Sequence, residues 1–577
     1  MGSVRRGPGP GGPLLAGLAS IGRSPRRPMY CAILILVCSP AWNQEPPAAP
    51  TQAPPVVTPE RIQEAGALLG LGFSPEEAAQ MLRGVAGSLR SFEALREREI
   101  GNGDYPVLLF DPLPSGVSYR PDRTPTLALT ELALPVVERP ADLEELAFAD
   151  IRTLAALIRG RKVGCVELTQ MYLARLRKLD ATLHCVITFT EERALAQAAA
   201  LDRELAEGKW RGPLHGIPWG AKDLLAAKGY RTTWGAKPFE EQVLDLDATV
   251  VARLDAAGAV LIAKLTLGAL AWGDVWFGGM TRNPWNPEQG SSGSSAGSAS
   301  ATAAGGVVFA IGSETLGSIV SPSTRCGNTS LRPTFGRVSR HGAMALSWSM
   351  DKLGPLCRSV DDAAIVLAAI QGPDGLDPTV KDLPFGVPAP GDVRGWKVGY
   401  LEGAFERNPA DAQVLDDLRA LGAELVPVQL PDYPLGAINI TLNAEAACAF
   451  DEITRDGLDE QLVRQVAQAW PNVFRTARLV PAVEYLRANR LRLLLMRDLD
   501  QVFAEIDVLV HPSFAGGVLT MTNLTGHPTL VAPHGFRDNG TPESISFTGR
   551  LYGEARLLAL ARAWQESTAH HLRHPEL

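Results

Sequence analysis

The stretch "GSSGSSAGSASATAAGG" runs from Gly290 to Gly306 and has three possible interpretations. It could be a flexible Gly/Ser linker between domains. Its segment 293–297 also matches G-x-S-x-G, the nucleophile elbow of serine hydrolases, which would make Ser295 the nucleophile. A third interpretation is that its serines act in catalysis in some other way. Each interpretation predicts a different fold and function.

The sequence around this stretch argues against a linker. Small residues continue through Ala299 and Ala303 and lead directly into "VVFAIGS" (307–313), an apolar run typical of a buried strand. A flexible linker separates domains and does not normally run into a buried strand without a polar break. Small side chains instead permit close approach of backbones. We therefore expect a packed segment.

The nucleophile elbow needs a strand before its serine and a helix after it. The sequence before Ser295 is "TRNPWNPEQG" (281–290), which we predict to be a loop. Four downstream histidines have no neighbouring pattern that marks them as catalytic, namely His341, His511, His527 and His534. The elbow interpretation is therefore disfavoured.

Three separated segments support the third interpretation. They are "GPLHGIPWGAKDLL" (212–225), "GSSAGSA" (293–299) and "GSETLGSIVSP" (312–322). In this order and spacing they resemble the amidase signature family, whose catalytic set is a lysine, a serine with a cis peptide bond and a nucleophilic serine. The resemblance covers about residues 144–566 and includes "LRPTFGRVSRHGAMALSWSMDKLGPLCRSVDDAAIVLAAIQG" (331–372) and "NLTGHPTLVAPHG" (523–535).

The resemblance implies hydrolysis of a linear amide C–N bond through an acyl-enzyme, without a metal or a cofactor. Lys222 would be the base, Ser294 the proton relay and Ser318 the nucleophile. Because a lysine must be neutral to act as a base, we expect burial to lower the pKa of Lys222. The backbone N–H groups implied for the oxyanion hole are those of Thr315, Leu316, Gly317 and Ser318.

Three positions depart from the common family pattern. Glu314, Leu316 and Val320 stand where many members have Asp, Gly and Arg. That Asp and Arg commonly form an ion pair, so we expect both ends of this pair to be changed here. The form "ETLGSIV" resembles a subgroup that includes bacterial peptide amidases more than amidotransferase A subunits. Two alternatives remain: a glutamine-hydrolysing A subunit of a tRNA-dependent amidotransferase, and an inactive binding protein on the same scaffold.

Helices and strands alternate along residues 144–577, which predicts one α/β domain. We expect a large mixed β-sheet covered by helices on both faces, as the amidase signature fold implies. Residues 61–143 are predicted to be a small helical and then irregular N-terminal extension.

The N-terminal region has the composition of a targeting segment. Residues 1–43 combine basic residues, a short apolar run and small residues, which predicts a signal peptide. Residues 44–60 are predicted to be a proline-rich linker. We therefore expect export to the periplasm or medium, or a cytoplasmic location if the segment is not a functional signal. The apolar run is too short for a stable membrane span.

Composition restricts the partners. The net charge of −8 argues against nucleic acid as a partner. The seven cysteines include no CxxC pair, so neither a zinc site nor a disulfide framework is indicated. We expect buried free thiols at Cys165, Cys185, Cys326, Cys357 and Cys448.

The expected partner is a small-molecule amide, and a homodimer is left open. Trp272, Trp276 and Phe277 precede the serine stretch and either line a substrate pocket or pack in the core. The sequence does not select among aliphatic amides, peptide amides, anilides and carbamates.

Overall fold

The computed structural model describes residues 57–406 and 408–577. The predicted signal peptide and most of the predicted linker lie outside these residues. The first helix, α1 (Pro59–Leu68), begins inside the segment predicted to be linker. Local sequence explains this difference, because the Thr58 hydroxyl accepts a hydrogen bond from the N–H of Arg61 and proline is favoured in the first turn. A second helix, α2 (Pro75–Arg96), packs against α1.

The segment between α2 and the main body has little regular structure. It contains the short strand β1 (Thr126–Leu127) and the single 3₁₀ turns η1 (Leu129–Glu131) and η2 (Leu143–Leu146). β1 pairs with β12 (Val387–Pro388), which joins this segment to the main body.

The central element is an eleven-stranded sheet in the order β14-β13-β15-β17-β16-β10-β11-β9-β3-β4-β2. The predicted large mixed sheet is confirmed: β14-β13-β15 and β9-β3-β4 pair in parallel, whereas the strands between β15 and β9, and the edge pair β4-β2, are antiparallel. The strands are β2 (Val186–Phe189), β3 (Pro218–Lys222), β4 (Val260–Leu265), β9 (Phe309–Glu314), β10 (Thr329–Arg332), β11 (Lys352–Cys357), β13 (Lys397–Leu401), β14 (Glu424–Val428), β15 (Val508–Pro512), β16 (Thr529–Phe536) and β17 (Pro542–Gly549).

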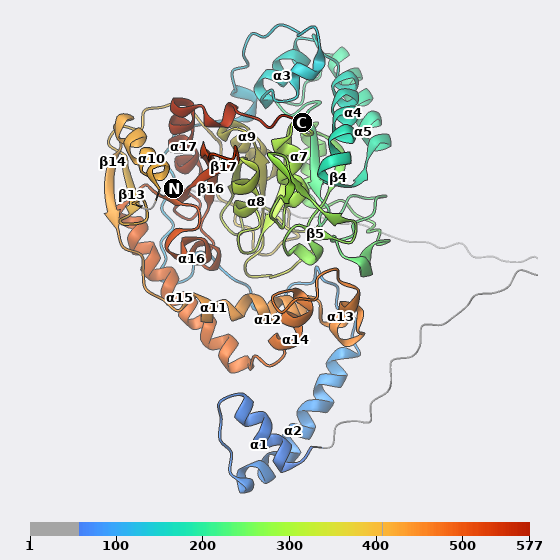
Figure 1. Cartoon of the computed structure of the whole chain (residues 1–577), viewed down its shortest axis with the longest axis vertical. Coiled ribbons are helices and arrows are strands. Elements are labelled where there is room, and N and C mark those ends of the chain that lie inside the picture. The colour runs from blue at the N-terminus through green and yellow to red at the C-terminus, as the bar shows by residue number, and fades with distance from the viewer. Residues whose placement is uncertain (1–56, 407) are drawn as a thin grey trace, which may run out of the picture. The chain divides into compact units, whose positions relative to one another are not determined.

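Helices cover both faces of this sheet (Figure 1). α7 and α8 pack side by side against the central strands, and α9 packs between α6 and α17. α4 and α5 lie beside β4 near one end of the sheet (Figure 1). The helices of the main body are α3 (Ile151–Arg159), α4 (Cys165–Leu183), α5 (Glu191–Ala206), α6 (Thr249–Ala257), α7 (Ala296–Ala303), α8 (Val320–Cys326), α9 (Val360–Ile370), α10 (Pro409–Ala420), α11 (Leu435–Ile438), α12 (Ile440–Ala449), α13 (Asp451–Arg455), α14 (Trp470–Ala477), α15 (Ala482–Glu505), α16 (Val518–Thr525) and α17 (Glu554–Thr568).

The Gly/Ser stretch is packed in the core. All residues of α7, which occupies its second half, are buried. The preceding segment, predicted to be a loop, instead forms a hairpin of β7 (Arg282–Asn283) and β8 (Asn286–Gly290). The Asn283 side chain accepts a hydrogen bond from the N–H of Trp285, which closes the turn. This hairpin forms a sheet of its own, so the segment still supplies no strand of the main sheet before Ser295.

One of the expected buried thiols is exposed. Four cysteines are buried as predicted, but Cys448 is exposed near the end of α12. Among the residues described, no helix combines the length and the apolar character needed to cross a bilayer.

Close packing around β11 gives a test of the fold. A Cβ at Gly354 would lie 2.1 Å from Leu331 O on the neighbouring strand. Gly354→Ala should lower the free energy of unfolding by about 1–3 kcal/mol, because backbone cannot move aside cheaply. At Gly535 in β16 a Cβ meets nothing within 4 Å, so Gly535→Ala is the matched control and should change stability by less than about 0.5 kcal/mol. Denaturant midpoints measure both, and equal stability of the two variants would contradict this packing.

Candidate active site

Lys222 ends β3 and is fully buried. Its Nζ lies 2.8 Å from Ser294 Oγ, 3.0 Å from Ser295 Oγ and 2.9 Å from Ser313 Oγ. The amine is therefore held by hydroxyls from the Gly/Ser stretch and from β9. No carboxylate among the described residues forms an ion pair with it.

The environment of Lys222 favours the neutral amine. Burial lowers the pKa of Lys222 well below its usual range, and the negative charges of Asp351 and Glu314 oppose this shift only in part. A neutral amine has a lone pair that can accept a proton, which a surface lysine at neutral pH lacks.

The residue after Lys222 anchors the end of β3. Asp223 Oδ1 lies 2.7 Å from Lys264 Nζ, and both side chains are fully buried. Asp223 Oδ2 also accepts hydrogen bonds from the backbone N–H and the hydroxyl of Thr233, at 2.8 and 2.6 Å. Because a buried carboxylate needs such partners, the Asp223 contacts orient the strand end that carries Lys222.

Ser294 is buried and lies where two loops approach closely. The Gly293–Ser294 peptide bond is cis. A Cβ at Gly293 would lie 1.8 Å from Gly273 O, so only glycine fits there. The N–H of Ser295 donates to Ser318 O at 3.1 Å, which joins the serine stretch to the loop containing Ser318.

Ser318 lies between β9 and α8 and is half-buried. Its Oγ makes no hydrogen bond to any residue that the structure describes. Within the same described part of the chain, four consecutive backbone N–H groups also lack an acceptor, namely those of Thr315, Leu316, Gly317 and Ser318. Gly317 has a φ of +87°, a conformation that glycine adopts readily. The loop therefore has free donors beside an accessible hydroxyl.

Asp351, the residue before β11, restrains this loop. The Thr315 hydroxyl donates to Asp351 Oδ1 at 2.5 Å. Asp351 Oδ2 accepts hydrogen bonds from the backbone N–H groups of Leu346 and Ser347, at 2.8 and 2.9 Å. With both oxygens occupied, the carboxylate fixes the position of the Thr315 side chain.

Glu314 has an arginine partner that the sequence did not indicate. Arg332 Nη1 lies 2.7 Å from Glu314 Oε1, and neither side chain is exposed. Glu314 Oε2 accepts hydrogen bonds from the N–H groups of Ile319 and Val320. Burial raises the pKa of Glu314, but the charge and hydrogen bond of Arg332 outweigh this effect and lower it to about 2. The arginine that pairs with Glu314 therefore comes from β10 and not from position 320, which is Val320.

The structure brings Lys222, Ser294 and the loop at 315–318 together, and it adds residues that sequence reasoning missed. Ser313 lies inside a quoted motif but carried no signal of its own. Arg332 ends β10, and Asp351 directly precedes β11. Only the pairing of these strands with their neighbours places them here.

The aromatic residues before the serine stretch divide into two groups. Trp276 is buried and packs edge-on against Phe277, with ring centroids 4.9 Å apart. Trp272 is half-buried, and the Arg464 guanidinium lies 5.4 Å from its ring centroid. Because Gly273 contacts the backbone at Gly293, Trp272 lies next to the serine stretch.

The sequence model of the family described as Amidase matches residues 167–558. The chain belongs to the amidase family. The A subunit of the glutamyl-tRNA(Gln) amidotransferase from Roseiflexus sp. is 37% identical to this amidase over 487 residues, which cover 75% of this chain and 99% of the relative. The corresponding protein from Thermosynechococcus vestitus is 35% identical over 473 residues, covering 73% and 98% of the two chains.

Solved structures include a second group of relatives. The peptide amidase from Stenotrophomonas maltophilia has a TM-score of 0.67 and 31% identity, and the match covers 75% of this chain and 99% of that one. The A subunit of the glutamyl-tRNA(Gln) amidotransferase from Thermotoga maritima has a TM-score of 0.62 and 25% identity, covering 74% and 96%. The amidase fold is thus shared with both groups.

The buried ion pair below the loop gives a stability prediction. Glu314→Gln leaves the charge of Arg332 buried without a carboxylate, so it should destabilise the protein by about 3–5 kcal/mol. Glu207→Gln is the control, because the Lys209–Glu207 pair is largely exposed, and it should cost less than about 1 kcal/mol. Denaturant unfolding measures both. A loss at Glu314 no larger than at Glu207 would contradict the buried pair.

Proposed function

We propose that this amidase hydrolyses a carboxamide with Ser318 as nucleophile, Ser294 as proton relay and Lys222 as base. The observation that carries the proposal is the 2.8 Å hydrogen bond between Lys222 Nζ and Ser294 Oγ in a fully buried environment. This contact couples a lysine of lowered pKa to a hydroxyl on the loop that also contacts the Ser318 backbone.

In the first step, Ser318 Oγ attacks the amide carbonyl carbon while its proton passes through Ser294 to Lys222 Nζ. The relay requires Ser318 Oγ to approach Ser294 Oγ, and such catalytic contacts commonly tighten when substrate binds. The carbonyl oxygen becomes an oxyanion that accepts hydrogen bonds from the free N–H groups at 315–318.

In the second step, the oxyanion collapses and the C–N bond breaks. The proton returns from Lys222 through Ser294 to the leaving nitrogen, which departs as ammonia or an amine. Water then attacks the ester carbonyl carbon of acylated Ser318, and the same relay accepts the water's proton and returns a proton to Ser318 Oγ. The products are a carboxylic acid and an amine, and the enzyme is regenerated.

A glutamine-hydrolysing amidotransferase A subunit is the second candidate. The sequence relatives favour it, since proteins of this name align over nearly their whole length. About a quarter of the present chain lies outside these alignments. That extra length, with the predicted signal peptide, supports an enzyme that is exported and acts alone.

Serine substitutions test the assigned roles. Ser318→Ala should lower turnover by about 10⁴-fold or more, because it removes the nucleophile. Ser294→Ala should lower kcat by about 10²–10⁴-fold, because the proton relay is lost. Ser292→Ala is the matched control, since its hydroxyl contacts Ser321 and not Lys222, and it should retain activity. Undiminished turnover by Ser318→Ala would overturn the assignment, and no turnover by the wild type on any amide would favour the inactive scaffold.

The pH profile tests the neutral lysine. Protonated Lys222 cannot accept a proton, so kcat/KM should fall as pH falls through its pKa. Because that pKa is lowered, kcat/KM should reach its plateau well below the ordinary lysine pKa of about 10.4. Lys222→Arg should be inactive at every pH tested, because guanidinium stays protonated. A rise centred near the ordinary lysine pKa would refute the proposal.

A substrate panel separates the two candidate functions. Ammonia release by the purified protein alone should be measured with acetamide, benzamide, an N-acetylated peptide amide and glutamine. We expect hydrolysis of at least one of the first three, and glutamine should be a poor substrate. Glutamine hydrolysis that appears only with co-purified partner subunits would instead support the amidotransferase assignment.

A further inference from the structure

The backbone directly before Ser294, residues 290–293, must hold this serine beside Lys222. Within this segment Ser292 has a φ of +61°, in the left-handed region that residues other than glycine seldom adopt. Such a conformation persists only where the surrounding contacts determine it. The contacts of residues 290–293 therefore decide where Ser294 lies.

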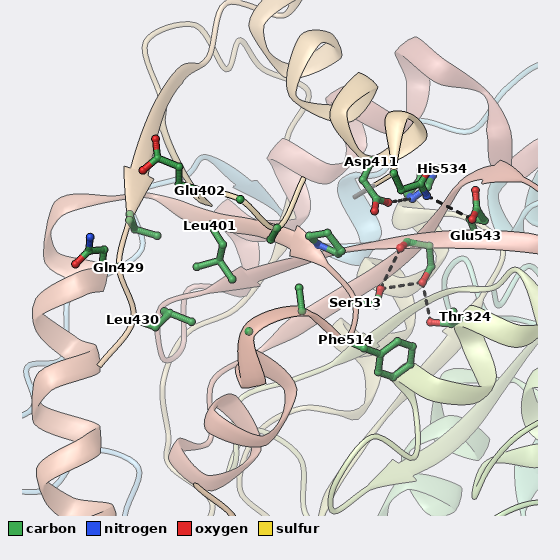
Figure 2. A pocket seen from close by; sticks show the side chains of 18 of the residues that line it. Thr324, Leu401, Glu402, Asp411, Gln429, Leu430, Ser513, Phe514, His534 and Glu543 are labelled. Carbon is green, nitrogen blue, oxygen red and sulfur yellow. Dashed lines mark hydrogen bonds and ion pairs between the residues drawn. The ribbon is translucent and has the colours of Figure 1, made fainter. Parts of the chain in front are cut away.

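On one side, the hydroxyl of Ser292 contacts α8. Ser292 Oγ lies 2.8 Å from Ser321 Oγ. Further along α8, the Thr324 and Ser544 hydroxyls lie 2.7 Å apart in the wall of a cavity of about 850 Å³ (Figure 2). Ser292 and Ser321 are both half-buried, so water can replace the contact between their hydroxyls. This side therefore does not fix the backbone of residues 290–293 by itself.

On the other side, the carboxylate of Asp274 contacts the backbone directly. Asp274 Oδ2 accepts a hydrogen bond from the N–H of Ser292 at 3.0 Å. The same oxygen packs against Gly290, where a Cβ would lie 2.0 Å from it. One carboxylate thus holds the segment at two places, and at one of them it satisfies the backbone donor of the residue with positive φ.

Asp274 is itself held in place. Its carbonyl oxygen accepts a hydrogen bond from the N–H of Thr281 at 3.1 Å, and Thr281 O accepts one from the N–H of Ser291 at 2.9 Å. Arg464 Nη2, from the segment that precedes α14, lies 3.6 Å from Asp274 Oδ1. Both carboxylate oxygens and the carbonyl oxygen of Asp274 therefore have partners.

We propose that Asp274 is a positioning residue for the proton relay, because it fixes the backbone before Ser294 and with it the contact between Ser294 Oγ and Lys222 Nζ. This inference rests on the proposed function of Ser294 as the relay. A proton passes between the hydroxyl and the amine only within hydrogen-bond reach. A displacement of about 1 Å is therefore enough to lower the rate by about 10²-fold.

Removal of the carboxylate tests this role, with an amide that the wild type hydrolyses. Asp274→Ala should lower kcat by about 10–100-fold at nearly unchanged KM, because Ser294 moves a proton and does not bind the substrate. Asp274→Leu, which keeps the branched shape without an acceptor, should show the same fall in kcat. Asp274→Asn retains an oxygen that accepts from the Ser292 N–H, so its kcat should stay within about threefold of the wild type. An equal loss in all three variants, or a raised KM at unchanged kcat, would overturn the inference.

Asp202→Ala is the matched control. Asp202 is also half-buried and accepts hydrogen bonds from two backbone N–H groups, those of Cys165 and Val166 at the start of α4, at 2.7 and 3.1 Å. Its substitution should lower the thermal midpoint and leave kcat unchanged, because these contacts lie outside residues 290–318. A fall in kcat as large as that of Asp274→Ala would show a general effect of lost stability and would overturn the inference.

A double-mutant cycle with Ser294→Ala separates the inference from the proposed function. Once the relay is removed, Asp274→Ala should change the residual kcat by less than about twofold, because residues that act as a unit are not additive. A further 10–100-fold fall in that background would overturn the inference and leave the proposed function intact. A kcat of Ser294→Ala equal to that of the wild type would overturn both, since there would be no relay to position.

Discussion

The contact on which the candidate active site depends is the buried amine of Lys222 among the hydroxyls of Ser294, Ser295 and Ser313. A charged ammonium in this environment would be costly, because burial removes it from water and no carboxylate among the described residues pairs with it. Burial therefore lowers the pKa of Lys222 and favours the neutral amine, which can act as a base, on a residue that is normally protonated. The strand β3 and the serine stretch must meet within hydrogen-bond distance for this to work.

Small residues make that meeting possible. Gly293 lies against the backbone of Gly273, and α7 has a run of Ala and Ser side chains that lie fully inside the core. The composition that resembles a flexible linker is thus a requirement of dense packing. The same composition explains the misleading G-x-S-x-G match, because Ser295 contributes a hydroxyl to Lys222 without being accessible to a substrate.

Two carboxylates beside the loop at 315–318 have partners inside the core. Glu314 is compensated by Arg332, and Asp351 accepts hydrogen bonds on both oxygens. These side chains hold the loop from two directions and leave its N–H groups free. A loop whose donors are exposed but whose position is fixed is what stabilisation of an oxyanion requires. For this role, the contacts that hold the loop in place are therefore as important as the residues that form it.

The sequence by itself determined the α/β class, the family and the three candidate residues Lys222, Ser294 and Ser318, because each lies in a short contiguous motif. Two predictions from local sequence were wrong. Residues 282–290 form a hairpin where we predicted a loop, and Cys448 is exposed where we predicted a buried thiol. Only the tertiary structure decided the partner of Glu314. Arg332 reaches Glu314 through the pairing of β10 with β11 and of β11 with β9. Such contacts follow from strand order, which no short segment encodes.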